Sequence, residues 1–523
     1  MRGSSRRQFV KSGIGSVIGA STMAPALVRG SSRPQVSHGV QSGEVDASSA
    51  VLWARADRLA VMQVDISRDL DFSRFERLPK VIALPDYDYV AKQKVQHLLS
   101  DTEYFYRVSF IDIDNSKIQS KPVFGRFKTA PQTHTTVRFG WGGDTVGQGW
   151  GIDLSRGGML MYQTLSQQGF DFFIHSGDTI YADGPLKESV TLPDGSLWKN
   201  LITEEKLKVA ESQSEFFGQW KYNLLDRHVR NFNANVPVYY QWDDHEVVNN
   251  WSPGKDLSSD DRYTEKSVAT LAARAANAFQ VMTPIGYNVS EPGRIYRSVS
   301  YGPSLEIFFL DLRRYRSANN EGVEATQNES SILLGRRQIE WFKSALKQSS
   351  STWKIIASDM PLGLIIWDNW KSQSGVEAIA NGKHSEPLGR ELEIAELLEF
   401  MATEDIRNTV WLTADVHYAA AHYYNPNSAV FKRFLPFWEF VAGPLHAGTF
   451  APNAIDKTFG PEVKFTSAAD PSRVNLSPEE GKQFFGLVEV DGDSQVMTIQ
   501  LKNRNNDVLY TQALTPDFPS SPS

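Results

Sequence analysis

The sequence predicts an α+β protein in which a small β-sandwich precedes a larger layered domain. Short alternating segments separated by turn residues run from residue 35 to residue 129, and this spacing is typical of a β-sandwich. From residue 137 onward, strand-like runs alternate with helical stretches, which indicates packed sheets and helices. Two alternating runs at 485–490 and 496–501 predict a closing hairpin.

The first 33 residues predict a signal peptide and a short leader for export. Arg6 and Arg7 precede a mildly apolar stretch rich in Gly and Ser, Ala24-Pro-Ala26 follows, and no acidic residue occurs before Glu44. This pattern resembles a twin-arginine signal with cleavage near Ala26. A weak membrane anchor is the alternative, but the stretch is too short and too polar to span a bilayer comfortably. We expect a periplasmic or secreted protein that is carried by the twin-arginine export machinery and has no stable membrane anchor.

Residues 34–131 are predicted to form the sandwich domain, with strands at 50–55, 61–66, 104–110 and 123–128. The polar segment 129–136 predicts a linker. A larger domain is expected over residues 136–514, and the tail 515–523, rich in Pro and Ser, is predicted to be disordered. The helices of the larger domain are expected at 160–168, 268–282, 335–346 and 390–401.

Composition excludes two classes of site. The chain has 523 residues, a formal net charge of −7 and no cysteine. Loss of the basic signal would make the charge about −11, so no general attraction to nucleic acid is expected. A cysteine-rich metal site is excluded.

Six apolar, strand-like runs in the larger domain each end in an aspartate. Functional groups of such sheets lie just past the carboxyl ends of the strands, so these carboxylates could meet at one rim. The alternative for any single strand is that the aspartate only forms a turn. The six residues are Asp144, Asp178, Asp244, Asp311, Asp359 and Asp415.

Other donors stand close to three of these aspartates. Tyr181 follows Asp178, His245 follows Asp244, and His417 follows Asp415 by two residues. Clustered oxygen and imidazole donors suit hard or borderline cations such as ferric iron, Mn, Zn or Ca. The pattern therefore predicts a metal site built from strand ends.

With these motifs, the chain resembles the alkaline phosphatase D (PhoD-like) family of metallophosphoesterases over nearly the whole mature sequence. The order and spacing of the motifs carry the resemblance more than any one of them. The matching stretches are HGVQSGEVD at 38–46, VLW at 51–53, SGDTIY at 176–181, WDDHEVVNNW at 242–251, LDLRRYR at 310–316, LGRRQIEW at 334–341 and LTADVH at 412–417.

The resemblance implies an immunoglobulin-like β-sandwich followed by a metallophosphoesterase-type catalytic domain with two packed sheets flanked by helices. It also implies Fe³⁺ with Ca²⁺ and hydrolysis of phosphate monoesters or diesters. Carried over by motif, Asp178 would bridge metals, and Tyr181 would bind iron as a phenolate. Asp415 and His417 would complete the cluster, Asp244 would bind the second metal, and His245 would face the substrate.

Chemistry supports these roles and leaves alternatives open. A tyrosine with a reference pKa of about 10 needs a strongly acidic ion to become a phenolate, so Tyr181 is otherwise an ordinary buried aromatic residue. His245 could protonate the leaving oxygen or only orient a ligand. Among the arginines that follow the strand ending at Asp311, we expect Arg316 to bind phosphate, although an ion pair is equally plausible.

Asp144 departs from the family pattern, because the family typically has a cysteine ligand for iron at this strand end. Carboxylate is a harder ligand than thiolate, so the metal preference can shift and Zn or Mn become possible. Asp144 could also lie beside the cluster without binding.

We therefore expect an exported, metal-dependent phosphoesterase with a metal-bound hydroxide nucleophile, and with Asp144, Asp178, Tyr181, Asp244, Asp415 and His417 as metal ligands. One alternative is a phospholipase D-like phosphodiesterase, in which aromatic segments near 367–370 and 434–438 line an apolar site or merely fill the core. The other is a secreted binding protein with a structural metal site.

Overall fold

The N-terminal part of the chain forms two antiparallel sheets. The computed structural model describes residues 33–288 and 290–518, so the predicted signal peptide lies outside the described residues, apart from Arg33. One sheet has the order β1-β2-β6, and the other has the order β4-β3-β7-β8 with β5 paired to β3. The strands are β1 (Val36–Gly43), β2 (Ala50–Ala56), β3 (Ala60–Ser67), β4 (Glu76–Arg77), β5 (Val81–Ala83), β6 (Val90–Val95), β7 (Glu103–Asp112) and β8 (Val123–Lys128), with a 3₁₀ turn at Pro85–Tyr87.

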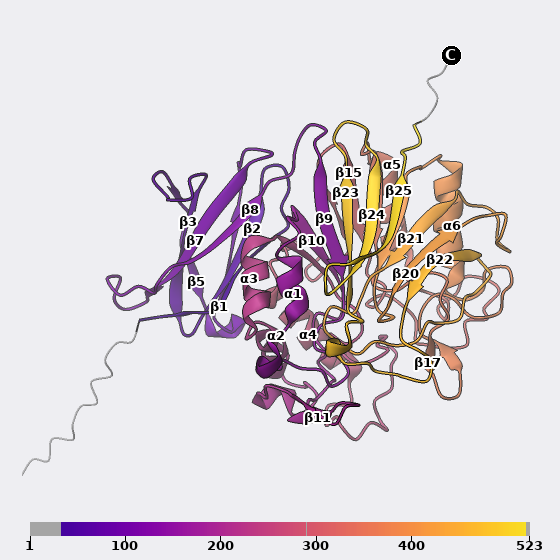
Figure 1. The fold of residues 1–523 in the computed structure, drawn as a ribbon, viewed down its shortest axis with the longest axis horizontal. Helices are drawn as coiled ribbons and strands as arrows, with labels where there is room; N and C mark the ends of the chain where they lie inside the picture. The colour runs from indigo at the N-terminus through magenta and orange to yellow at the C-terminus, as the bar shows by residue number, and fades with distance from the viewer. Residues whose placement is uncertain (1–32, 289, 519–523) are drawn as a thin grey trace, which may run out of the picture. The chain divides into compact units, whose positions relative to one another are not determined.

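Side chains from both of these sheets share one core, which includes Leu52 from β2, Val64 from β3 and Tyr106 from β7. The alternating polar and apolar residues of the sequence place one face of each sheet inward. The predicted β-sandwich is therefore confirmed, and Figure 1 shows it in indigo and purple.

The rest of the chain is built on two larger mixed sheets. The six-stranded sheet has the order β13-β10-β9-β23-β24-β25, and the seven-stranded sheet has the order β14-β15-β16-β19-β21-β20-β22. The first comprises β9 (Val137–Gly142), β10 (Phe172–Ser176), β13 (Val238–Gln241), β23 (Phe484–Val490), β24 (Met497–Asn503) and β25 (Val508–Leu514). The second comprises β14 (Arg297–Ser300), β15 (Leu305–Phe309), β16 (Trp353–Ala357), β19 (Thr409–Thr413), β20 (Ala419–Tyr424), β21 (Phe437–Val441) and β22 (Pro461–Ser467).

The two sheets pack face to face, with Phe139 and Ile174 of one sheet in the same core as Ile355 and Leu412 of the other. Strands β9, β10 and β13 run parallel, as do β15, β16, β19 and β21. Parallel strands align their carboxyl ends along one edge of a sheet, which is the arrangement that the strand-end aspartates require.

Helices cover the outer face of each sheet (Figure 1). The six-stranded sheet packs against α1 (Leu160–Leu165), α2 (Gln213–Asn223), α3 (Arg227–Asn235) and α4 (Val268–Met282), and the seven-stranded sheet packs against α5 (Arg336–Gln348) and α6 (Glu391–Thr403). Three apolar residues of α5, Ile339, Phe342 and Leu346, recur at helical spacing and are buried. The predicted architecture of two packed sheets flanked by helices is confirmed.

Shorter elements lie in the connections. They are the hairpins β11 (Ser189–Thr191) with β12 (Leu197–Lys199) and β17 (Trp367–Asn369) with β18 (Ser374–Val376), and 3₁₀ turns at Leu154–Arg156, Glu204–Lys206 and Pro478–Glu480. The expected closing hairpin is β23 and β24, and β25 adds a third strand. At the start of the tail, Asp517 exchanges hydrogen bonds with Asn408. None of the described helices combines the length and apolar character needed to cross a membrane.

The sandwich is joined to the end of α4 by hydrogen bonds to main-chain carbonyls. The indole of Trp53 donates to the carbonyl of Val281 at 2.9 Å. The ammonium group of Lys92 donates to the carbonyls of Gln280 at 2.6 Å and Ile285 at 2.9 Å. These bonds satisfy carbonyls that a helix end leaves without partners.

We predict that Lys92 makes the stability of the protein rise with pH above neutrality. Burial lowers the pKa of Lys92 to about 7, whereas an unfolded lysine titrates near pH 10.4. Between these values the unfolded state binds more protons, so the free energy of unfolding should rise with pH by at most about 1.4 kcal/mol per pH unit. Urea unfolding from pH 7 to 10 should show this slope in the wild type and a smaller one in Lys92→Met. Lys94→Met, at an exposed position of the same strand, is the control and should keep the slope. The prediction would be contradicted if the free energy of unfolding rose equally with pH in the wild type and in Lys92→Met.

Candidate metal centre

Carboxylates from both sheets meet at the carboxyl ends of the parallel strands. Asp144 follows β9, Asp178 follows β10, and Asp415 follows β19. Within residues 33–288 and 290–518, three groups of side chains have ligand atoms within 4.8 Å of one another, and the first two share Asp178 while the last two share Asp244. The groups are Asp144, Asp178 and His417; Asp178, Asp244 and His245; and Asp243, Asp244 and Asp415. Five of the six predicted metal ligands are among them.

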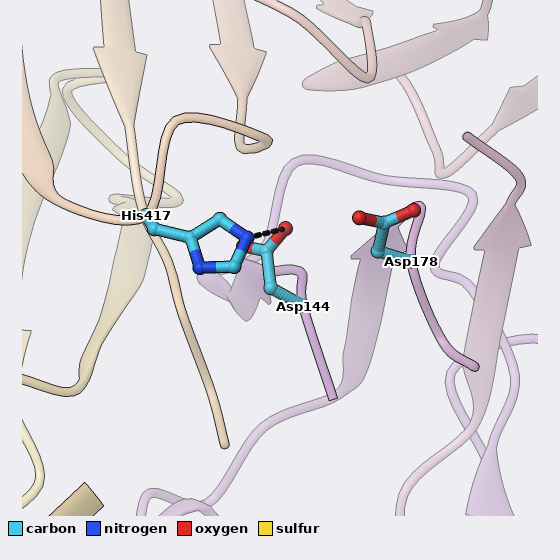
Figure 2. A group of neighbouring side chains, drawn as sticks. All are labelled: Asp144, Asp178 and His417. Atoms are coloured by element: carbon cyan, nitrogen blue, oxygen red, sulfur yellow. Dashed lines mark ion pairs between the residues drawn. The ribbon is translucent and has the colours of Figure 1, made fainter. Parts of the chain in front are cut away.

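Tyr181, the sixth predicted ligand, also faces this cluster. Its hydroxyl lies 2.9 Å from Nε2 of His417, and the same Nε2 lies 3.6 Å from Oδ1 of Asp144. Figure 2 shows Asp144 and His417 facing each other, with Asp178 across from them. Nδ1 of His417 is hydrogen-bonded to the carbonyl of Gly448, so it carries the proton and leaves the lone pair of Nε2 directed at the cluster.

Four of the six predicted ligands have a strained backbone. Asp144, Asp178, Asp415 and His417 all have φ between 48° and 68°, in the left-handed region that non-glycine residues adopt at a cost. Such conformations persist where the surrounding structure enforces them and cluster at functional sites. Here they turn the chain sharply at the strand ends.

The donor set fits a hard or borderline cation. Among the described residues, both carboxylate oxygens of Asp144, one of Asp243 and one of Asp244 are buried and have no hydrogen-bond partner. Burial, and then the charges of neighbouring carboxylates, raise the pKa of Asp144, Asp178 and Asp415 well above its usual range. Buried carboxylates without partners are costly unless they are neutralised. Cations bound by carboxylate, imidazole and phenol groups would supply that neutralisation.

Glu246, which the sequence analysis did not single out as a site residue, holds two parts of the centre together. Its buried carboxylate accepts hydrogen bonds from the backbone N–H groups of Asp178 at 3.1 Å, Thr179 at 2.6 Å and Asp243 at 2.7 Å. It therefore ties the loop after β10 to the loop after β13. Its position next to His245 was the only signal available in the sequence.

His245 lies at the edge of the cluster and is held by a second residue that was not predicted, Asp183. Nδ1 of His245 lies 2.7 Å from Oδ1 of Asp183, and its ring lies 4.2 Å from that of Tyr181. Burial works against the charged imidazole, but the charges of Asp183 and then Asp244 raise the pKa of His245 to about 9. His245 is therefore a cation at neutral pH in the metal-free geometry.

Arg313 rather than Arg316 is the arginine in contact with the aspartates. The side chain of Arg313 is fully buried, with Nε 2.5 Å from Asp243 and 3.5 Å from Asp359. Arg316 is also fully buried, but it pairs with Glu377. Both arginines therefore form ion pairs with carboxylates, which is the alternative to phosphate binding that the sequence left open.

Two further strand-end aspartates, Asp311 and Asp359, and the motif residue Asn250 lie outside the three ligand groups found among the described residues. Asp311 accepts a hydrogen bond from the backbone of Arg314, as a turn residue does, and another from the indole of Trp242 in a distant segment. Asp359 is buried, and neither of its oxygens has a hydrogen-bond partner among the described residues. The N–H of Asn250 donates to Asp244, so this asparagine supports a predicted ligand through its backbone.

Comparison with known proteins gives consistent matches. The profile of the PhoD-like phosphatase family matches residues 139–501, and that of the PhoD-like phosphatase N-terminal domain matches residues 22–131. Alkaline phosphatase D of Bacillus subtilis (strain 168) is 25% identical over 405 residues, which cover 72% of this chain and 64% of that protein. The chain thus spans less than two thirds of this curated relative.

Two solved structures share the fold. A structure of PhoD superposes with a TM-score of 0.68 at 19% identity and covers 93% of this chain and 90% of its own. The purple acid phosphatase PPD1 from yellow lupin (Lupinus luteus) superposes with a TM-score of 0.56 at 12% identity, covering 93% and 75%.

We predict that Asp183 keeps His245 protonated. An adjacent opposite charge shifts a pKa by about 1–3 units, so Asp183→Asn should lower the pKa of His245 by that amount in metal-depleted protein. NMR titration of histidine-labelled protein, with His245 assigned from a His245→Gln sample, would measure the shift. Asp171→Asn changes a carboxylate at the opposite end of β10 and should leave the titration unchanged. An equal pKa in wild type and Asp183→Asn would show that the ion pair does not control this histidine.

Proposed function

The chain belongs to the PhoD-like phosphatase family, and on that premise we propose that it is an exported, metal-dependent phosphoesterase. The observation that carries the proposal is the run of three linked groups of carboxylate and imidazole ligands at the strand ends. Linked groups with shared carboxylates suit two or more cations held close together. Phosphate monoesters, diesters or both are the proposed substrates.

The proposed ligands are the six residues predicted from the sequence. Asp178 shares one group of neighbouring ligand atoms with Asp144 and His417 and another with Asp244 and His245, and Tyr181 contacts His417. Asp178 is accordingly the proposed bridging ligand. When bound, such cations neutralise the charge of a phosphoryl group and polarise it as Lewis acids.

Residues of the chain also supply charge and hydrogen bonds around the proposed metal centre. His245 is the proposed donor to a phosphoryl or leaving-group oxygen. Asp183 fixes its ring by accepting from Nδ1, which leaves Nε2 for the substrate. Arg313 offsets the charge of Asp243 and Asp244, and Arg316 is proposed to act through Glu377.

We further propose Fe³⁺ beside Tyr181 and Ca²⁺ beside Asp244, with Zn or Mn as the alternatives that Asp144 allows. Burial, and then the charges of Asp178 and Asp144, raise the pKa of Tyr181 well above its ordinary value. Tyr181 therefore keeps its proton unless a strongly acidic cation binds the phenol oxygen. Ferric iron is such a cation.

Domain limits and location complete the proposal. The immunoglobulin-like domain would span residues 34–131 and the catalytic domain residues 136–514, in line with the two profile matches. Export by the twin-arginine machinery to the periplasm or the medium rests on the sequence of residues 1–33.

Replacing the proposed bridging ligand should abolish hydrolysis. Loss of a residue that only supports a metal ligand costs about 10–100-fold, so Asp178→Asn should lower kcat/KM for p-nitrophenyl phosphate and bis(p-nitrophenyl) phosphate by more than about 100-fold. Metal content, measured on the same samples, should fall as well. Asp171→Asn, at the other end of β10, serves as the control. Full activity in folded Asp178→Asn would refute the proposed site.

Tyr181 should give the metal-loaded protein a visible colour. A ferric phenolate absorbs in the visible range, so we expect iron by elemental analysis and an absorption band that Tyr181→Phe removes. The comparison should use protein purified without chelators, with Tyr162→Phe as the control, since Tyr162 is also buried but its hydroxyl contacts Thr145. Colourless, active protein containing Zn or Mn would keep the hydrolase proposal and exclude the iron assignment.

A further inference from the structure

Among the described residues of the centre, those at its edge keep some exposure to solvent. Asp144, Asp178, Tyr181 and Asp243 are about 1% exposed. The side chain of His245 is 12% exposed, Asp415 is half-buried, and Asn249 is exposed. Solvent therefore reaches the centre next to His245 and Asn249, and a substrate can approach there.

The hairpin β17–β18 is attached at this edge. Asn250 donates from its side-chain amide to the carbonyl oxygen of Asp368 at 3.0 Å and to its carboxylate at 2.9 Å. The backbone N–H of the same asparagine donates to Asp244. One residue thus links a proposed metal ligand directly to strand β17.

The other end of the hairpin is attached to the charged network beneath the centre. Glu377 directly follows β18, is buried, and pairs with Arg313. Its carboxylate also accepts a hydrogen bond from the amide of Asn319 at 2.6 Å. With both ends tied to groups that contact the aspartates, the hairpin has a defined position relative to the site.

The tip of the hairpin presents a tryptophan to solvent. Trp370 is 75% exposed, whereas Trp53, Trp141 and Trp411 are almost fully buried. It stands two residues after Asp368, at most about 7 Å along the chain. The ammonium group of Lys371 lies 5.7 Å from its ring centre, so an aromatic face and a positive charge lie together near the open edge.

We propose that Trp370 is a specificity-determining residue that contacts the ester group which stays on phosphorus during hydrolysis. This inference rests on the proposed phosphoesterase function. An indole face favours flat or apolar groups, since aromatic stacking combines apolar burial with few rotamers to order. The enzyme should therefore prefer diesters whose second ester group is aromatic over those with a small alkyl group. The sequence alone left Trp370 open between the core and a substrate site, and its exposure excludes the core.

Two substrates that release the same product test this role. Phenyl p-nitrophenyl phosphate and methyl p-nitrophenyl phosphate share the nitrophenolate leaving group and differ only in the retained ester group. The metal-loaded wild type should have a kcat/KM about 10-fold higher for the phenyl diester, mainly through a lower KM. In Trp370→Ala this ratio should fall towards one, and Trp370→Phe should keep most of it.

Phe124→Ala is the matched control, because Phe124 is a 54% exposed aromatic residue on the sandwich. It should keep the wild-type ratio. A wild-type ratio near one, or the wild-type ratio in Trp370→Ala, would overturn the inference. The proposed function would still stand if the wild type hydrolysed both diesters. Failure of the metal-loaded wild type to hydrolyse either diester or p-nitrophenyl phosphate would overturn the proposed function and the inference with it.

Discussion

Mutual repulsion among buried carboxylates is the constraint on which the rest of this structure depends. Asp144, Asp178, Asp243 and Asp244 come together at the ends of strands from one sheet, and Asp415 joins them from the other. Charges of one sign in a dry interior are tolerated only if cations or protons offset them. The strained turns at Asp144, Asp178 and Asp415 show that folding brings these groups together despite that cost, which is expected of a centre that cations complete.

The protein offsets part of this charge with its own cations, and it does so unevenly. Arg313 is buried against Asp243 and Asp359, and His245 lies between Asp183 and the cluster. Around Asp144 and His417 no arginine or lysine pairs with the carboxylates in the part of the chain that the structure describes. The side with Tyr181 and His417 therefore depends most on an external cation, and it also has the donors best suited to a highly charged one.

Much of the architecture was predictable because it depends on local patterns. Alternation predicted the sandwich, apolar runs predicted the strands of the larger sheets, and the strand-end rule brought Asp144, Asp178, Asp244 and Asp415 to one place. The same rule also selected Asp311, whose carboxylate accepts hydrogen bonds from Trp242 and from the backbone of Arg314 and is in none of the three ligand groups among the described residues. Asp183, Glu246 and Arg313 could not be recognised as supporting residues, because their partners come from distant segments and depend on how the loops pack.

If the centre binds metals as proposed, Asp144 in place of the cysteine that the family resemblance implies would change its chemistry but not its charge, since thiolate and carboxylate each carry one negative charge. A carboxylate offers two oxygens in place of one sulfur, so it needs more room and can bind through either or both atoms. Gly443 supplies that room, because a β-carbon there would lie 2.2 Å from Oδ2 of Asp144. With Tyr181 and His417 still in place, this side becomes an all-oxygen and imidazole site. Under the proposed assignment such a site would favour hard cations, which include the ferric ion proposed beside Tyr181.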